Sequence, residues 1–179
     1  QVVIVGGGPA GILLSQRLFL EGIDNIVLER QTRDHVLSRI RAGVLEWGTV
    51  NVLRESGVGD RMDRDGHTHD GTGIVWGGEH HLVLDTKKYA DRPMMAYGQT
   101  SITEDLYAVR DANHGTIIHG VENVTLNDLK TTSPWVSYEK HGEFHRIDCE
   151  FIAGCAGFHG VSRKTIRENL PVWVVRHNV

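Results

Sequence analysis

The sequence predicts an α/β fold in which a parallel sheet is accompanied by a small antiparallel β meander and an inserted hairpin. The first 29 residues run through an apolar strand, a glycine-rich turn, a helix, a second apolar strand and an acid, which is the order of a βαβ opening. Paired glycines separate strand-like runs at 74–76 and 80–84, as a tight hairpin requires. Further short strand patterns between 121 and 149 indicate the meander.

The turn after the first strand carries Gly6, Gly8 and Gly11. Glycines at this spacing let the backbone approach a pyrophosphate closely, and the following helix directs its free N–H groups and positive dipole end at the anion. Pro9 suits the first helical turn, because proline there loses only an N–H that has no helical partner. The turn therefore predicts a Rossmann-like dinucleotide-binding domain.

Glu29 completes this pattern at the end of the second strand run, 26–28. A carboxylate at this place accepts hydrogen bonds from both hydroxyls of an adenosine ribose, and it repels a 2′-phosphate. The turn by itself therefore favours FAD or NAD over NADP. Glycine turns alone also occur for structural reasons, but strand, turn, helix, strand and acid in register favour dinucleotide binding.

Periodicity along the remaining chain alternates between helix and strand. Helices are expected over 9–21, 44–56 and 101–113, stopping at Gly22, Gly57 and Gly115. The third is expected to open with a capping box from Ser101 to Glu104. The core-facing residues expected in the first two are Ile12, Leu13, Leu14, Leu18, Phe19, Leu45, Val52 and Leu53. Strands are expected at 1–5, 26–28, 74–76, 80–84, 94–97, 117–118, 121–127, 135–139, 144–149 and 151–153.

Composition narrows the function classes. The 179 residues carry a net charge of −4 with both signs interspersed, so no basic stripe points to nucleic acid. No apolar run approaches the ~20 residues that span a bilayer, and two cysteines are too few for a disulfide framework. We therefore expect no nucleic-acid or membrane partner and a reducing cytoplasm. The opening inside a strand and the apolar run at 173–179 favour a piece of a larger protein.

Two other constellations have a simpler structural interpretation. His67, His69, His80 and His81 have side chains of the kind that bind zinc, but their alternation along a hairpin favours a solvated strand face. Cys155 lacks a CxxC partner, so a small buried residue is favoured over a redox centre. No metal site is therefore predicted.

Five blocks of the sequence carry a family resemblance over roughly residues 1–165. They are VVIVGGGPAG (2–11), ERQT (29–32), RIRAGVLE (39–46), YGQT (97–100) and GFHGVSR (157–163). Together they resemble the 4-hydroxybenzoate 3-monooxygenase (p-hydroxybenzoate hydroxylase) family of class A flavoprotein aromatic hydroxylases, in its N-terminal portion. A match spread over five blocks is more specific than the glycine turn, which many unrelated proteins share.

This resemblance implies an FAD-binding domain over 1–165 and a divergent or truncated tail over 166–179. In the family this domain is discontinuous, and the hairpin region 70–98 reaches toward the substrate domain. The Gly-Asp flavin motif and the substrate-orienting residues of the family lie beyond the matched blocks. We therefore expect no catalytic residue in this chain and no activity from it alone.

The resemblance also implies a reaction cycle. NADPH, with NADH as the alternative, reduces bound FAD, the flavin traps O₂ as a hydroperoxide, and the distal oxygen converts 4-hydroxybenzoate to 3,4-dihydroxybenzoate, so that the cofactor carries the hard chemistry. The partners implied for the full-length protein are a small phenolic acid, O₂ and a second copy in a homodimer. Its implied location is the cytoplasm.

Matched positions carry the cofactor roles that the resemblance implies. The three turn glycines would hold the FAD pyrophosphate and Glu29 the ribose, while Arg41 would add a guanidinium fork and Gln99 would hydrogen-bond near the ribityl chain. The segment 30–39, where His35 replaces a family tyrosine, matches positions used for NADPH, as does the His159 and Arg163 pair. The expected cofactor-binding set is Gly6, Gly8, Gly11, Glu29, Arg30, Arg41, Gln99, Ala156, Gly157, His159 and Arg163.

Ala156 is the largest departure from the family. The family motif Cys-Asp-Gly reads Cys155-Ala156-Gly157 here, and its acid helps organise both flavin and nicotinamide coenzyme binding. Loss of the acid would leave a nearby arginine without a partner, and a buried unpaired guanidinium is costly. We therefore expect weaker FAD binding than in family members that keep the acid.

Two other functions remain open. One is a dinucleotide-binding module without catalysis, which Ala156 and the absent motifs favour. The other is a class A hydroxylase for a different phenol, because the residues that choose the substrate lie outside the matched blocks.

Overall fold

The computed structural model describes residues 1–169, apart from the side chains of 80–83 and 167–169, and it has the predicted α/β architecture. The apolar run predicted at 173–179 lies outside the described residues. The helices are α1 (Pro9–Leu20), α2 (Arg33–Ser38), α3 (Trp47–Glu55), α4 (Asp60–Asp65), α5 (Thr86–Ala90), α6 (Gln99–Ala112) and α7 (Val161–Asn169). The strands are β1 (Val2–Val5), β2 (Asn25–Glu29), β3 (Val44–Glu46), β4 (His67–His69), β5 (Gly71–Trp76), β6 (Glu79–Asp85), β7 (Met94–Ala96), β8 (Thr116–His119), β9 (Glu122–Asn127), β10 (Trp135–Lys140), β11 (Glu143–Asp148) and β12 (Phe151–Gly154).

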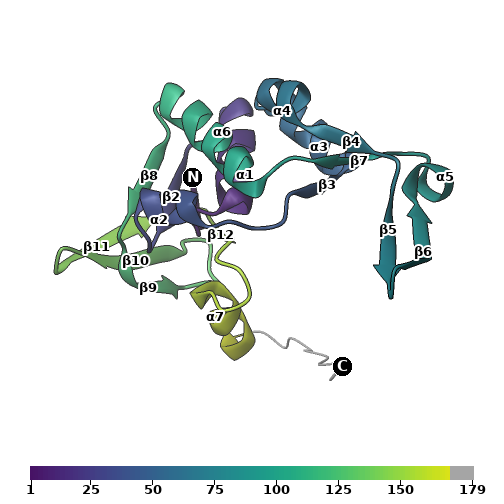
Figure 1. The fold of residues 1–179 in the computed structure, drawn as a ribbon. Helices are drawn as coiled ribbons and strands as arrows, with labels where there is room; N and C mark the ends of the chain where they lie inside the picture. The colour runs from purple at the N-terminus through teal and green to yellow at the C-terminus, as the bar shows by residue number, and fades with distance from the viewer. Residues whose placement is uncertain (170–179) are drawn as a thin grey trace.

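A four-stranded parallel sheet in the order β12-β1-β2-β8 forms the centre of the fold (Figure 1). The chain leaves β1 through α1 to β2 on one side, whereas β12 pairs with the other side of β1. Strand order therefore switches direction at β1. In open α/β sheets, ligands bind at the carboxyl ends of the strands beside such a switch point.

Alternate residues of β1 face two separate cores, because successive side chains of a strand point to opposite faces. Val2 and Ile4 pack in the cluster that includes Ile12 of α1 and Leu106 of α6. The side chains of Val3 and Val5 pack instead with residues of the meander β9-β10-β11, including Val136 and Tyr138. Figure 1 shows the two helices and the meander on opposite sides of the sheet. Both faces are covered, which explains the continuous apolar run of β1.

The second predicted helix begins later than expected. Residues 44–46 form β3, which pairs antiparallel with β7, and α3 starts at Trp47. The side chains of Val50 and Leu53 are buried, whereas Leu45 lies in the strand and Val52 is 36% exposed. The pairing partner lies about fifty residues further along the chain, so the local pattern could not reveal the strand.

Two details of α6 also differ from the expectation. The helix starts at Gln99 with Gly98 as its N-cap and has no side-chain cap, so the capping box from Ser101 to Glu104 is wrong. Left-handed backbone occurs at His114, with φ of 54°, rather than at Gly115. A Cβ at Gly115 would instead collide with the guanidinium of Arg110.

The inner face of α1 is more polar than predicted. The side chains of Ser15 and Gln16 are buried, whereas Phe19 is 40% exposed. Asn25 Oδ1 accepts a 2.5 Å hydrogen bond from Ser15 Oγ, and the Ser56 carbonyl accepts a 3.0 Å bond from Gln16 Nε2. These partners lie outside α1, in β2 and after α3, and their hydrogen bonds offset the free-energy cost of burying the two polar side chains.

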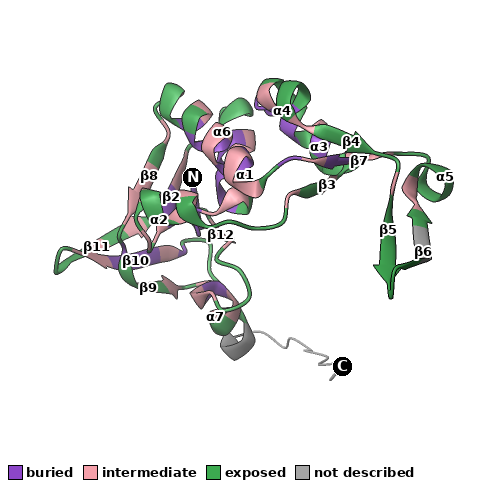
Figure 2. Ribbon diagram, in the orientation of Figure 1, coloured by how far each residue is buried: buried purple, intermediate pink, exposed green. Residues whose placement is uncertain are grey.

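The predicted hairpin and meander are both confirmed. Gly77 and Gly78 have φ of 61° and 84°, the left-handed backbone that a tight turn demands. The β5-β6 hairpin stands away from the central sheet, and the side chains that the structure describes in it are largely exposed (Figure 2). Among the described residues, no helix is long and apolar enough to cross a bilayer, and no cluster suited to a metal ion occurs. His67 and His69 are exposed, as expected, but they lie in β4, which pairs with β7, and not along the hairpin.

Candidate functional site

Three of the predicted segments meet at the carboxyl edge of the parallel sheet. The glycine turn follows β1, Glu29 ends β2, and the Cys155-Ala156-Gly157 segment follows β12. The Gly6 N–H donates to the Leu28 carbonyl at 2.8 Å, and the Cys155 N–H donates to the Val5 carbonyl at 2.8 Å. These bonds fix the turn between its two neighbours at the switch point.

The three turn glycines are required for different reasons. Gly6 has φ of 118°, and a Cβ there would lie 2.6 Å from the Cys155 carbonyl carbon. A Cβ at Gly11 would collide with the carbonyl of Gly6. Gly8 has ordinary extended backbone, and a Cβ there would meet nothing within 4 Å. Packing explains Gly6 and Gly11, whereas the open space at Gly8 is what close approach of a phosphate requires.

The same open space lies at the start of α1. Gly8 is the N-cap, no side chain caps the helix, and the Gly8 carbonyl accepts the N–H of Ile12 at 3.0 Å. The N–H groups of the first turn therefore have no partner within the helix, and the helix dipole adds positive potential there. This geometry suits a phosphate or pyrophosphate.

Two backbone N–H groups hold the carboxylate of Glu29 in place. Gly7 donates to Oε2 at 2.6 Å, and Gln31 donates to Oε1 at 2.8 Å. The side chain is half-buried, and each carboxylate oxygen can accept more than one hydrogen bond. Glu29 is thus oriented beside the glycine turn while it retains acceptor capacity for ribose hydroxyls.

Tyr107 supports this arrangement, and the sequence analysis missed it. Its buried hydroxyl donates to the Gly7 carbonyl at 2.9 Å, and its ring stacks on His119 with centroids 5.7 Å apart. The Arg33 guanidinium lies 5.0 Å from the ring centroid and pairs with Asp111 at 2.6 Å. Burial raises the pKa of Tyr107 far above its ordinary value, so the phenol remains a donor. The one feature of the sequence that could have indicated this role is the position of Tyr107 on the inner face of a helix.

The structure brings the loop that carries Arg41 next to the segment that leads into Gln99 at the start of α6. The Tyr97 N–H donates to the Gly43 carbonyl at 2.7 Å, and a Cβ at Gly43 would collide with the Tyr97 carbonyl. Arg41 is exposed and Gln99 is half-buried at the first turn of α6. Arg30 is exposed beside Glu29.

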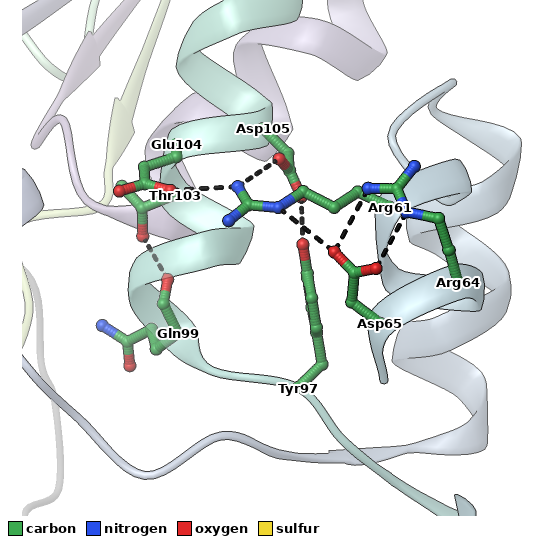
Figure 3. A network of polar contacts seen from close by, with 8 residues as sticks. All are labelled: Arg61, Arg64, Asp65, Tyr97, Gln99, Thr103, Glu104 and Asp105. Carbon is green, nitrogen blue, oxygen red and sulfur yellow. Dashed lines mark hydrogen bonds and ion pairs between the residues drawn. The ribbon is translucent and has the colours of Figure 1, made fainter. Parts of the chain in front are cut away.

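A polar network fixes the start of α6, which carries Gln99 (Figure 3). The Tyr97 hydroxyl donates to Asp105 Oδ2 at 2.6 Å, and Arg61 Nη1 reaches Asp105 at 3.1 Å and Glu104 at 3.0 Å. Burial, reinforced by the bond to Asp105, raises the pKa of Tyr97 far above its ordinary value. Figure 3 shows the Gln99 amide pointing away from this network, which leaves it free for other contacts.

The last predicted residues form a cluster of their own. The Phe158 ring lies 3.7 Å from the Arg163 guanidinium carbon and 5.0 Å from the His159 ring. Ala156 is exposed, and Gly157 has φ of 72°. Arg163 is half-buried against an aromatic face. Among the described residues, no hydrogen bond or ion pair joins Phe158, His159 or Arg163 to Glu29 or Arg41.

The residues at the carboxyl edge fit a flavin adenine dinucleotide. An uncapped helix start, an open position at Gly8 and an oriented carboxylate lie together, and these are the groups that pyrophosphate and ribose require.

Comparison with known proteins agrees with this geometry. A family model described as FAD binding domain matches residues 1–172. The p-hydroxybenzoate hydroxylase of Acinetobacter baylyi is 36% identical over 169 residues, which cover 94% of this chain and 42% of the relative. The rifampicin monooxygenase of Streptomyces venezuelae is 36% identical over 175 residues, which cover 96% of this chain and 34% of the relative.

Solved structures share the fold. The p-nitrophenol 4-monooxygenase of Pseudomonas putida superposes with a TM-score of 0.77 at 21% identity, covering 92% of this chain and 42% of that one. The chain thus spans less than half the length of the relatives it matches. On the strength of the family match, which extends over nearly the whole chain, this protein belongs to the FAD binding domain family.

Proposed function

We propose that this chain is the FAD-binding part of an NAD(P)H-dependent monooxygenase that hydroxylates 4-hydroxybenzoate to 3,4-dihydroxybenzoate. The observation that carries this proposal is the 36% identity to a p-hydroxybenzoate hydroxylase over 94% of the chain. Residues 1–165 form the FAD-binding domain in this proposal, the 70–98 hairpin region faces the substrate domain, and 166–179 is a separate tail.

The proposed binding roles follow from the geometry. Gly6, Gly8 and Gly11 shape the turn that receives the pyrophosphate, and Glu29 accepts the ribose hydroxyls while Gly7 and Gln31 hold its carboxylate. The side chain of Arg41 is exposed, so its guanidinium is accessible to the FAD pyrophosphate. The Gln99 amide extends from the start of α6. The guanidinium fork of Arg41 matches phosphate geometry.

The nicotinamide coenzyme is assigned to a second set of residues. Arg30, beside Glu29, and the pair His159 and Arg163 supply cationic or hydrogen-bonding groups, with Ala156 and Gly157 at the turn before α7. Because Glu29 repels a 2′-phosphate at the first turn, we assign the 2′-phosphate of NADPH to the cluster that contains His159 and Arg163. NADH is the alternative coenzyme.

Bound FAD supplies the redox chemistry of the proposed reaction with O₂. The chain itself binds and orients the cofactor. The Tyr107 hydroxyl holds the Gly7 carbonyl at 2.9 Å, and Gly7 in turn holds Glu29. These hydrogen bonds already restrict the backbone of the turn before FAD binds. The turn therefore loses less conformational entropy on binding.

A different phenolic substrate is the second candidate. Rifampicin monooxygenase also has 36% identity to this chain, and a Bacillus subtilis relative is named only as an aromatic compound monooxygenase. A non-catalytic FAD- or dinucleotide-binding module is the third candidate, because Ala156 stands where the family has an acid and the family's substrate-orienting residues lie outside the matched blocks.

The deciding experiment uses the full-length protein, purified with FAD, and a panel of phenolic acids. Oxidation of NADPH or NADH is recorded together with the products, identified by mass spectrometry. Stoichiometric 3,4-dihydroxybenzoate from 4-hydroxybenzoate is expected. If another phenol is hydroxylated and 4-hydroxybenzoate is not, the second candidate, a hydroxylase for a different phenol, is supported. Tight FAD binding without substrate-stimulated coenzyme oxidation selects the third.

The proposed partners and location follow the same assignment. The full-length protein takes a small phenolic acid and O₂, forms a homodimer and resides in the cytoplasm. Sedimentation of the full-length protein at several concentrations tests the homodimer, and a monomer at all of them would exclude it.

A further inference from the structure

A pocket lies at the opposite edge of the parallel sheet from Glu29. It has a volume of about 470 Å³, and its lining includes Val2, Asn25 and Thr116, at the amino ends of β1, β2 and β8. The glycine turn and Glu29 follow the carboxyl ends of the same strands. The pocket is therefore separate from the proposed dinucleotide site.

Arg110 is the unusual residue in the lining of this pocket. Its side chain projects from α6 and is 3% exposed. In the part of the chain that the structure describes, its Nε and Nη1 atoms have no hydrogen-bond partner. Burial lowers the pKa of Arg110, and no neighbouring charge opposes that shift. An arginine nevertheless keeps its proton in proteins, so the pocket contains an uncompensated cation.

The neighbours of Arg110 do not satisfy its donors. The Phe19 ring lies 4.8 Å from the guanidinium carbon and stabilises the positive charge from one face. A ring face cannot accept the N–H groups that point outward in the guanidinium plane. Asp24 and Asp148 also line the pocket, but among the described residues neither forms an ion pair with Arg110. The carboxylate of Asp148 pairs with Arg146 at 2.6 Å. A buried guanidinium without an anionic partner is expensive.

The composition of the lining indicates the class of anion. Phe19, Ile23, Ile26 and Ile147 supply apolar surface next to the guanidinium, and Asn25 and Thr116 supply polar groups. A guanidinium fork matches a carboxylate in a bidentate geometry. A volume of about 470 Å³ falls within the range of small-molecule sites.

We propose that this pocket binds a small carboxylic acid with an apolar body, its carboxylate paired with Arg110 and its body against Phe19 and Ile23. The contact removes the uncompensated charge and buries the apolar part of the ligand. Gly115 contributes by leaving room for the guanidinium, because a Cβ there would collide with it. The proposal does not depend on the reaction that the full-length protein catalyses.

The test measures binding of benzoate to the full-length, FAD-loaded protein by isothermal titration and by thermal unfolding. Benzoate is expected to bind saturably and to raise Tm. Arg110→Met keeps much of the apolar stem but removes the fork, and it should weaken this binding about tenfold or more. Arg64→Met is the matched control, because Arg64 is exposed and pairs with its neighbour Asp65. It should bind benzoate as the parent does.

The possible outcomes separate clearly. Unchanged benzoate binding in Arg110→Met assigns the ligand to another site, including a phenolic-acid site, and overturns the proposal. Absence of binding to the parent protein overturns it as well. Equal binding of inorganic phosphate contradicts the apolar part of the ligand. If Arg110→Met does not fold, benzoate-soaked crystals of the parent decide, because a carboxylate on Arg110 supports the site and an empty pocket rejects it.

Discussion

Gly7 and Glu29 are joined by a 2.6 Å hydrogen bond from the backbone N–H of the turn to the carboxylate Oε2, across 22 residues of sequence. The bond ties the glycine turn after β1 to the end of β2. Tyr107 reinforces it from α6 by donating to the carbonyl of the same glycine at 2.9 Å. The proposed pyrophosphate and ribose positions are therefore parts of one hydrogen-bonded unit.

Replacement of Glu29 by glutamine should weaken FAD binding by about ten- to a hundredfold, since hydrogen bonds to charged groups contribute about 1.5–3 kcal/mol. Flavin-fluorescence titration of the purified protein measures this. Glu143→Gln, at an exposed position on β11, is the charge-matched control and should bind FAD normally. Equal affinities of the two variants would remove Glu29 from the ribose site.

Gly8 and Gly11 should respond differently to substitution. Gly8→Ser should preserve or slightly raise Tm, because the backbone is extended, a Cβ meets nothing, and serine is a favourable N-cap. It should still impair FAD binding by filling the space above the helix start. Gly11→Ala should lower the Tm of the apoprotein, because its Cβ collides with the Gly6 carbonyl. Normal FAD affinity in Gly8→Ser would show that no phosphate approaches this position.

Ala156→Asp should tighten coenzyme binding, because the resemblance implies that an acid at this position helps to organise both the flavin and the nicotinamide coenzyme sites. Ala156 lies next to Gly160, just before the start of α7. FAD and NADPH are titrated separately. Ala108→Asp, on an exposed position of α6, controls for added charge. An equal gain in both variants would assign the effect to net charge rather than to position 156.

Removal of the Tyr97 hydroxyl should cost about 0.5–1.5 kcal/mol of stability, the usual net contribution of one hydrogen bond. Tyr97→Phe leaves Asp105 paired with Arg61, so the carboxylate does not lose all its partners. Urea unfolding gives the difference in free energy. Tyr89→Phe is the control, since Tyr89 is 71% exposed. A stability change no larger than that of the control would mean that the network in Figure 3 does not stabilise the start of α6.

Alkaline pH should destabilise the protein through its two cysteines. Burial raises the thiol pKa of Cys149 and Cys155. The unfolded thiols therefore ionise first, and stability falls as pH rises from the ordinary thiol range through the higher folded values. Urea unfolding between about pH 7 and about pH 10 measures the slope. The double variant with alanine at both positions should lose stability less steeply, and an identical slope would contradict the effect.

Local sequence patterns predicted most of the fold. β1, α1 and β2 lie at the positions that the glycine turn and the apolar runs predicted. The hairpin and the meander also form at the positions predicted from their strand patterns and turn residues. The helices α2, α4, α5 and α7 were not predicted. Other errors occur where a partner outside the local segment decides the outcome. Residues 44–46 become a strand because β7 pairs with them, and Ser15 and Gln16 turn inward because Asn25 and Ser56 satisfy them.

The sequence by itself determined that a glycine turn, a helix start and an acid would serve a dinucleotide, because their spacing along one βαβ unit is local. Tertiary structure alone decided how these groups are held and where charge remains unpaired. Tyr107 meets Gly7 from a helix a hundred residues away, and Arg110 loses its solvent and finds no acceptor among the described residues. Hydrogen-bond partners and burial are properties of packed surfaces, and packing joins residues whose separation in sequence carries no pattern.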